Sequence, residues 1–144
     1  MKYLLILVIG LIMNTSLAQQ YPWTGKCDNA QSVAEMNECM TKSCDEAKVY
    51  YDNTYNTLFK KVQSGFKKAK KGTVQFDILS KYNTYLPRLK KSLSENALCS
   101  SELDAAGSIG GSEYDAIKAE IFLKQIENNI TLLKTLEAEL PTFN

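Results

Sequence analysis

Histidine is absent from the 144-residue sequence, and arginine occurs once. Without histidine the chain lacks the commonest general base, the commonest metal ligand and every Ser–His or Cys–His nucleophile pair. It also lacks a Cys-x-x-Cys pair, the lysine of a P-loop and the alternation of apolar and polar residues that is typical of strands. We therefore expect no catalytic residue, no metal site and no cofactor, and a function that depends on binding.

The chain has the composition of a globular protein, with 44% hydrophobic and 23% charged residues, which excludes collagen-like and disordered classes. Its beginning is typical of a secretory signal peptide: Lys2 gives the positive end, residues 3–13 are apolar, and Ser16-Leu17-Ala18 is a small-residue cleavage site. This apolar run is well below the ~20 residues that span a bilayer. We therefore expect residues 1–18 to be removed, leaving a periplasmic or secreted domain of residues 19–144 with no transmembrane anchor.

A capping box predicts the start of the first helix. In Ser32-Val33-Ala34-Glu35 the serine hydroxyl caps the Glu35 amide, and the Glu35 carboxylate reaches back. Downstream, apolar residues repeat every eleven residues, at about 3.67 residues per turn, which predicts one nearly straight helix as far as Gly72. We interpret this stripe as core and not as a ligand box. It consists of Val33, Met36, Met40, Cys44, Ala47, Tyr51, Tyr55, Leu58, Val62, Phe66 and Ala69.

Two further helices follow from the same spacing. Thr73 caps the second, which Pro87 bends without dividing it, and a loop over residues 100–111 comes next. Ser112 opens the third, which stops at Pro141. The apolar face of the third helix consists of Ile117, Phe122, Ile126, Ile130, Leu133, Leu136 and Leu140. The predicted fold class is all-α: a three-helix bundle whose first two helices form a long antiparallel hairpin.

The four cysteines form an even set, which in an exported domain indicates two disulfides with three alternative pairings. Cys44 lies 28 residues before Gly72 and Cys99 lies 27 after it, so antiparallel helices place them side by side. Cys39 and Cys44 are too far apart along one helix to be bonded, and a Cys39–Cys99 bridge would hold the two helices about 9 Å out of step. We therefore predict that Cys44–Cys99 and Cys27–Cys39 bridges brace the bundle.

The charges of the mature chain cancel but are segregated. Residues 60–91 sum to +9 and residues 92–144 to −6. The lysines around the predicted hairpin end either bind an anionic polymer or membrane surface, or simply form a solvated helix end that complements the helix dipole. The single arginine argues against specific nucleic-acid binding. We call this cluster the lysine tip: Lys60, Lys61, Lys67, Lys68, Lys70 and Lys71, with Lys81 nearby.

The third helix is acidic. Glu113, Asp115, Glu120 and Glu127 either form a face for a cationic partner protein or a solvated helix surface. Because a narrow helical bundle offers no obvious cleft to raise the pKa of one carboxyl, we do not expect these carboxylates to perform glycosidase chemistry.

One block of the sequence resembles a known family. The segment Cys27-Asp28-Asn29-Ala30-Gln31-Ser32-Val33-Ala34-Glu35-Met36-Asn37-Glu38-Cys39 is similar to the opening of the LprI-like domain family of small exported bacterial proteins. Tyr51-Asp52-Asn53-Thr54-Tyr55 and Gly110-Gly111-Ser112 extend the resemblance. The chain departs from the family in lacking the cysteine of the last helix and in having Cys44.

The family is named for a lysozyme inhibitor, so the resemblance implies inhibition of lysozyme in the cell envelope. The function we expect is therefore binding to a lysozyme or another envelope protein by protein–protein contact. The alternative is an envelope module that binds an anionic polymer or a membrane surface through the lysine tip.

Overall fold

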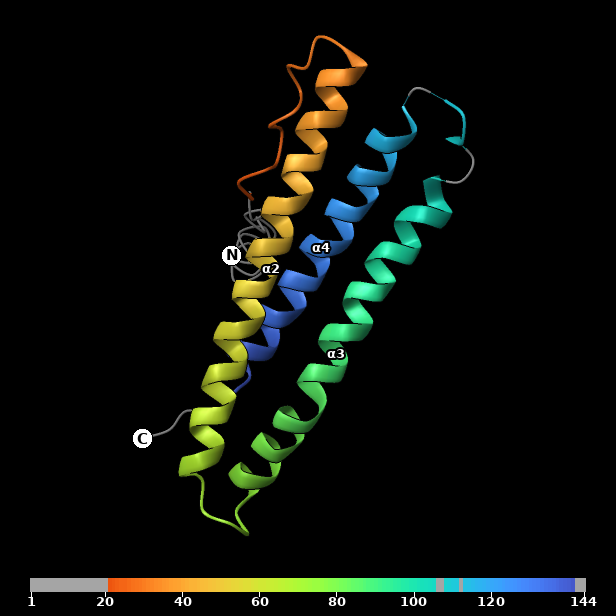
Figure 1. The fold of residues 1–144 in the computed structure, drawn as a ribbon. Coiled ribbons are helices and arrows are strands. Elements are labelled where there is room, and N and C mark those ends of the chain that lie inside the picture. Colours follow the sequence, from red (N-terminus) through yellow and green to blue (C-terminus); the bar gives the residue numbers. More distant parts are fainter. Residues whose placement is uncertain (1–20, 106–107, 112, 142–144) are drawn as a thin grey trace, which may run out of the picture.

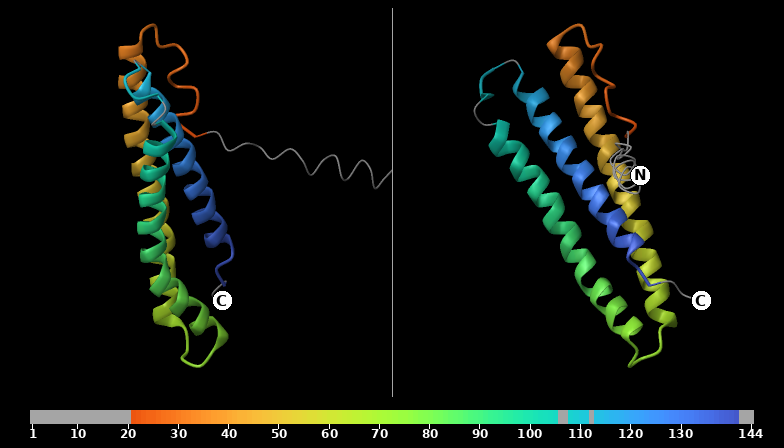
Figure 2. Two further views of the ribbon diagram at one scale, coloured as in Figure 1. Left: turned by 90° about the vertical axis from the view of Figure 1, so that its right-hand side faces the viewer. Right: turned by 180° about the vertical axis from the view of Figure 1, so that it is seen from behind.

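The structure is a computed structural model that describes residues 21–105, 108–111 and 113–141. The described residues form three helices and no strand: α2 (Val33–Lys68), α3 (Val74–Ala105) and α4 (Tyr114–Ala138). The helices run alternately up and down; α4 lies between the diverging arms of the α2–α3 hairpin at the open end and against one face of the hairpin toward its own C-terminal end (Figures 1 and 2). This confirms the all-α bundle. The expected signal peptide, residues 1–18, lies outside the described residues.

Helix α2 begins at the predicted capping box. The Glu35 amide donates to the Ser32 hydroxyl (3.2 Å), and the Glu35 carboxylate accepts from the Gln31 amide (2.9 Å). The centre of the predicted stripe is buried, but the helix ends at Lys68 and not at Gly72. Gly72 has φ +82°, a left-handed conformation that cannot continue an α-helix and suits the turn that follows.

Helix α3 begins at the predicted cap, where the Phe76 amide donates to the Thr73 hydroxyl (3.2 Å), and it continues through Pro87. It also runs to Ala105, so the loop expected from residue 100 begins later. Small residues explain this difference. Ala97, Ser101 and Ala105 are four residues apart and fully or almost fully buried, so they give α3 a packing face without large apolar side chains.

Helix α4 begins at Tyr114, and its N-cap Glu113 makes no side-chain capping bond. The predicted cap, Ser112, lies outside the described residues. The helix ends at Ala138, three residues before Pro141. The expected apolar face is confirmed, because its six residues on α4 and Leu140, which follows the helix, are all buried or half-buried. The six are Ile117, Phe122, Ile126, Ile130, Leu133 and Leu136.

The core extends along the contact of all three helices. Leu58 and Val62 of α2, Leu79 of α3, and Ile130 and Leu133 of α4 have no solvent exposure. Asn129 is a buried polar residue among them, and its side-chain amide donates to the Leu93 main-chain carbonyl (3.2 Å), which joins α4 to α3. The packing of α4 against both other helices therefore unites the bundle.

Only one of the two predicted disulfides is present among the described residues. Cys27 and Cys39 are bonded, as predicted, whereas Cys44 and Cys99 are free thiols. Helix α4 explains the missing bridge. Cys44 lies toward α4, with its sulfur 3.6 Å from the Ala119 carbonyl oxygen, and Cys99 is exposed on α3. The second bridge would require α2 and α3 to pack directly against each other at the level of Cys44 and Cys99, but α4 lies between them at this end (Figure 1).

Candidate functional site

The N-terminal arm, residues 21–31, folds back along the bundle as consecutive tight turns. Tyr21 and Trp23 anchor it: their rings are stacked, with centroids 5.0 Å apart, and both meet Tyr50 of α2 edge-on. The Trp23 indole donates to a Glu127 carboxylate oxygen on α4 (2.8 Å). Trp23 is only 4% exposed, so the arm is a packed part of the domain that joins α2 to α4.

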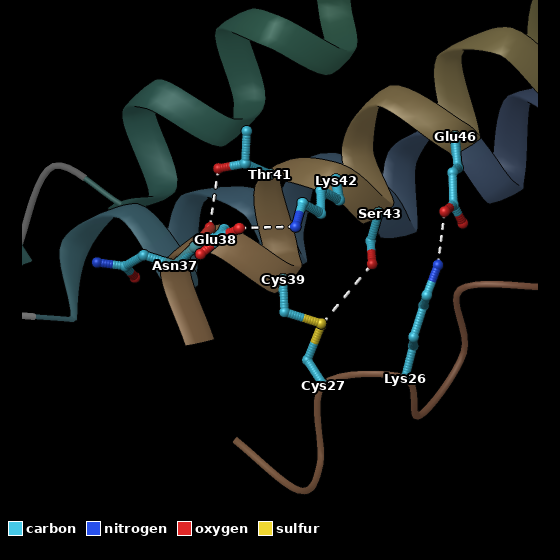
Figure 3. The surroundings of a disulfide bond; sticks show 9 residues. All are labelled: Lys26, Cys27, Asn37, Glu38, Cys39, Thr41, Lys42, Ser43 and Glu46. Atoms are coloured by element: carbon cyan, nitrogen blue, oxygen red, sulfur yellow. Dashed lines mark hydrogen bonds and ion pairs between the residues drawn. A yellow bond between two sulfur atoms is a disulfide. The ribbon is translucent and has the colours of Figure 1, made fainter. Parts of the chain in front are cut away.

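The disulfide fixes the other half of the arm (Figure 3). Cys27 is buried and bonded to Cys39 on the first turns of α2, and its sulfur lies 3.7 Å from the hydroxyl of the fully buried Ser43. Next to it, Lys26 reaches across to Glu46 of α2 (2.5 Å). Arm and helix are thus held by a covalent bond, an ion pair and an aromatic cluster.

A cleft of about 950 Å³ opens between the arm, the first turns of α2 and the first half of α4. Its apolar surface includes Trp23 and Leu123, which are buried, and Val33, Met36, Met40 and Ile117, which are half-buried or exposed. This volume is at the upper end of the range for small-molecule sites and accommodates several side chains of a partner. The expectation that the bundle has no cleft was therefore wrong.

Carboxylates predominate among the charged residues of this cleft. Asp28 of the arm, Glu113, Glu120 and Glu127 line it, against a single lysine, Lys124. An apolar surface with an acidic rim matches a segment that presents an apolar side chain flanked by cationic ones. We call it the acidic cleft.

Three of the four predicted acidic site residues therefore lie in one place. Glu113 and Glu120 are exposed on its rim, whereas Glu127 is half-buried and already accepts the hydrogen bond from Trp23. Asp115 is exposed on α4 but does not line the cleft. The contribution of the arm to the cleft was not predicted from the sequence. The two aromatic residues that precede the first cysteine, Tyr21 and Trp23, were the available signal.

A second charged cluster closes the same end of the bundle. Lys118 of α4 forms an ion pair with Glu102 of α3, and the Tyr114 hydroxyl donates to the same carboxylate (3.0 Å). The hydrogen bond from Lys118 is the main reason why the pKa of the Glu102 carboxyl lies below its usual value. Lys118 is thus paired outside the acidic cleft, and Lys124 is the basic residue of α4 that lines it.

The lysine tip lies at the opposite end of the molecule. Its six lysines are exposed, and Lys61 is paired with Glu137 near the end of α4. The 36 residues of α2 separate the two ends by about 54 Å at ~1.5 Å per residue. The two predicted surfaces, one acidic and one basic, are therefore far apart.

No protein-family model, curated protein or solved structure matches this chain. Within the described residues, no helix has the length and apolar content to cross a membrane. Among the residues that the structure describes, no three or more Cys, Asp or Glu side chains are grouped so that they could hold a metal ion.

Proposed function

We propose that this protein is an exported binding protein of the bacterial cell envelope, similar to lysozyme inhibitors, which acts by protein–protein contact and not by catalysis. The acidic cleft is the observation that carries the proposal. It combines an apolar floor with Glu113 and Glu120 on its rim, next to a buried indole.

The cleft fits a cationic protein better than a small metabolite. Its floor is built from thioether and aliphatic side chains, which adapt to the shape of an inserted residue. The rim carboxylates would steer a cationic partner into contact and orient it. The rim residue Glu120 lies 17 residues, about 25 Å, before Glu137 on α4, and Glu137 pairs with Lys61 at the near edge of the tip. The charge of the tip therefore does not oppose this approach at physiological ionic strength, where the screening length is about 8 Å.

Two observations favour a lysozyme as the partner. The N-terminal block from Cys27 to Cys39 resembles the LprI-like family, and the charge of the acidic cleft is opposite to that of a cationic lysozyme. The Cys27–Cys39 disulfide suits the oxidising envelope space to which a signal peptide would direct the chain.

The test combines inhibition and binding. Purified residues 19–144 are added to a cationic c-type lysozyme acting on bacterial cell walls, and affinity is measured by calorimetry. We expect micromolar or tighter binding with inhibition, and an association rate that falls as salt rises. No binding and no inhibition at micromolar protein would contradict the proposal.

Matched variants locate the interface. The E113Q/E120Q variant removes two rim charges, while E38Q/E95Q removes two carboxylates that are exposed on other surfaces. We expect the rim variant to weaken binding roughly tenfold, as two exposed charge contacts of up to about 1 kcal/mol each allow. The control variant should bind like the wild type. Equal losses in both variants would show that general charge, and not the acidic cleft, attracts the lysozyme.

A further inference from the structure

The lysine tip is a second surface whose charge is not neutralised. Residues 60–81 contain seven lysines and a single acid, Asp77. Lys61 is paired with Glu137, but no described carboxylate lies within 4 Å of the ammonium groups of the other six. These unpaired lysines are Lys60, Lys67, Lys68, Lys70, Lys71 and Lys81.

The tip projects beyond the rest of the bundle. Helix α4 ends at Ala138, close to the level at which Lys61 meets Glu137, and α2 continues to Lys68. The turn between α2 and α3 therefore lies past the end of α4 (Figure 1). Within this turn the Thr73 amide donates to the Lys70 carbonyl (3.3 Å).

Exposed apolar side chains lie among the lysines of the tip. Val74 is 76% exposed on the first turn of α3, and Ile78, one helical turn later, is 36% exposed. At the same end of the bundle, Phe66 of α2 and Phe76 of α3 stack on each other with centroids 5.0 Å apart, which joins the ends of the two helices. The tip is thus a firm projection that combines exposed aliphatic groups with unpaired lysines.

We propose that the lysine tip docks on the surface of an anionic lipid bilayer. Lysines near an anionic membrane are attracted by its surface potential, and an exposed aliphatic side chain gains further by entering the headgroup region. A nucleic acid fits less well, because Phe66 and Phe76 stack on each other, leaving their facing surfaces unavailable to bases, and Arg88 is the only fork-shaped donor of the chain.

Docking of this kind places α2 and α3 end-on to the membrane. The acidic cleft then lies toward the far end and faces the surrounding space, because Met40, the last α2 residue that lines it, is 20 residues and about 30 Å along α2 from Lys60. This inference does not depend on the proposed lysozyme contact, because the two surfaces share no residue.

Vesicle co-sedimentation tests the proposal with the mature chain. We expect binding to phosphatidylglycerol–phosphatidylcholine vesicles, no binding to pure phosphatidylcholine, and release in 1 M salt, where the screening length is about 3 Å. The variant K67Q/K68Q/K70Q/K71Q should lose about fivefold in partitioning for each lysine, several-hundred-fold in total. Failure to bind anionic vesicles, or equal binding to both vesicle types, would overturn the proposal.

The control carries the same change of net charge elsewhere. In K42Q/K48Q/K91Q/K124Q four exposed lysines outside the tip are neutralised, and we expect this variant to keep at least half of the wild-type vesicle binding. Circular dichroism confirms that both variants keep their helices. A loss as large as that of the tip variant would overturn the assignment to the tip.

A third variant distinguishes a bilayer from a soluble polyanion. V74S/I78S keeps every lysine, so its retention on heparin should match the wild type, while its vesicle binding should fall about tenfold because Val74 and Ile78 no longer enter the headgroup region. Unchanged vesicle binding of this variant, together with heparin retention that only the tip lysines control, would assign the tip to an anionic polymer instead.

Discussion

Mutation of the contact between Trp23 and Glu127 tests directly whether the N-terminal arm is held against α4 to form the acidic cleft. The indole donates to the Glu127 carboxylate at 2.8 Å, and Trp23 is 4% exposed. Replacing Trp23 with phenylalanine removes the donor and leaves a half-buried carboxylate without that partner, which costs about 1–3 kcal/mol. Replacement with alanine also empties the aromatic site and costs about 3–5 kcal/mol.

A double-mutant cycle isolates this contact. Glu127→Met leaves the indole without its acceptor, so W23F and E127M should each be destabilising. The double variant W23F/E127M removes both polar groups, and its loss should be smaller than the sum of the single losses by about 1 kcal/mol or more. Urea unfolding followed by circular dichroism at a helical wavelength measures all four proteins without relying on tryptophan fluorescence.

The result also separates a docked arm from a loose one. If the arm is held as described, W23A lowers the free energy of unfolding of the whole bundle, because Trp23 contacts Tyr50 of α2 and Glu127 of α4. Strictly additive single variants, or a W23A protein within about 0.5 kcal/mol of the wild type, would refute the reasoning, since surface changes alone have effects of that size.

Three further predictions concern other parts of the chain. Thiol titration of the unreduced protein should count two free cysteines, and Cys99 should be alkylated faster than Cys44 because Cys99 is exposed while burial raises the pKa of the Cys44 thiol; a count of zero would restore the second bridge. Asn129→Ala should cost about 0.5–1.5 kcal/mol in urea unfolding, because it removes the buried hydrogen bond that joins α4 to the Leu93 carbonyl of α3, and a neutral effect would contradict this. The hydrogen bond from Lys118 lowers the pKa of Glu102, so this carboxylate stabilises the fold above its unfolded pKa and loses the effect as the pH falls through its lowered folded value. Between about pH 5 and pH 3 the wild type should therefore lose more stability than Glu102→Gln, and parallel curves would contradict the pairing.

Local signals in the sequence were sufficient to predict that the three helices form. The capping box of α2, the Thr73 cap of α3 and the apolar spacing of all three helices depend on residues close together in the chain. The Cys27–Cys39 bridge was predicted as the pair that remains once Cys44 is joined to Cys99, so the bridge is confirmed although the pairing on which it rested is absent. The end of α3 was not predicted, because Ala97, Ser101 and Ala105 become a packing face only where another helix approaches closely.

The acidic cleft required contacts that the spacing of residues along the chain does not encode. Glu113, Glu120 and Glu127 were singled out for their charge, but the arm that turns their helix face into a cleft lies about a hundred residues earlier in the chain. Trp23 is the residue that joins these two segments. No periodic pattern in the sequence predicts such a contact, because the contact depends on where the arm packs against α4.

The sequence by itself determined the helical class, the hairpin and the segregation of charge, because each follows from neighbouring residues or from composition. Only the tertiary structure decided where α4 lies. By packing between the arms of the hairpin, α4 meets Cys44 at the open end, so the second bridge does not form, and it provides the wall against which the arm closes the acidic cleft. Both outcomes have one physical reason: the side chains of a third helix compete for the apolar faces that a two-helix hairpin would otherwise bury against itself.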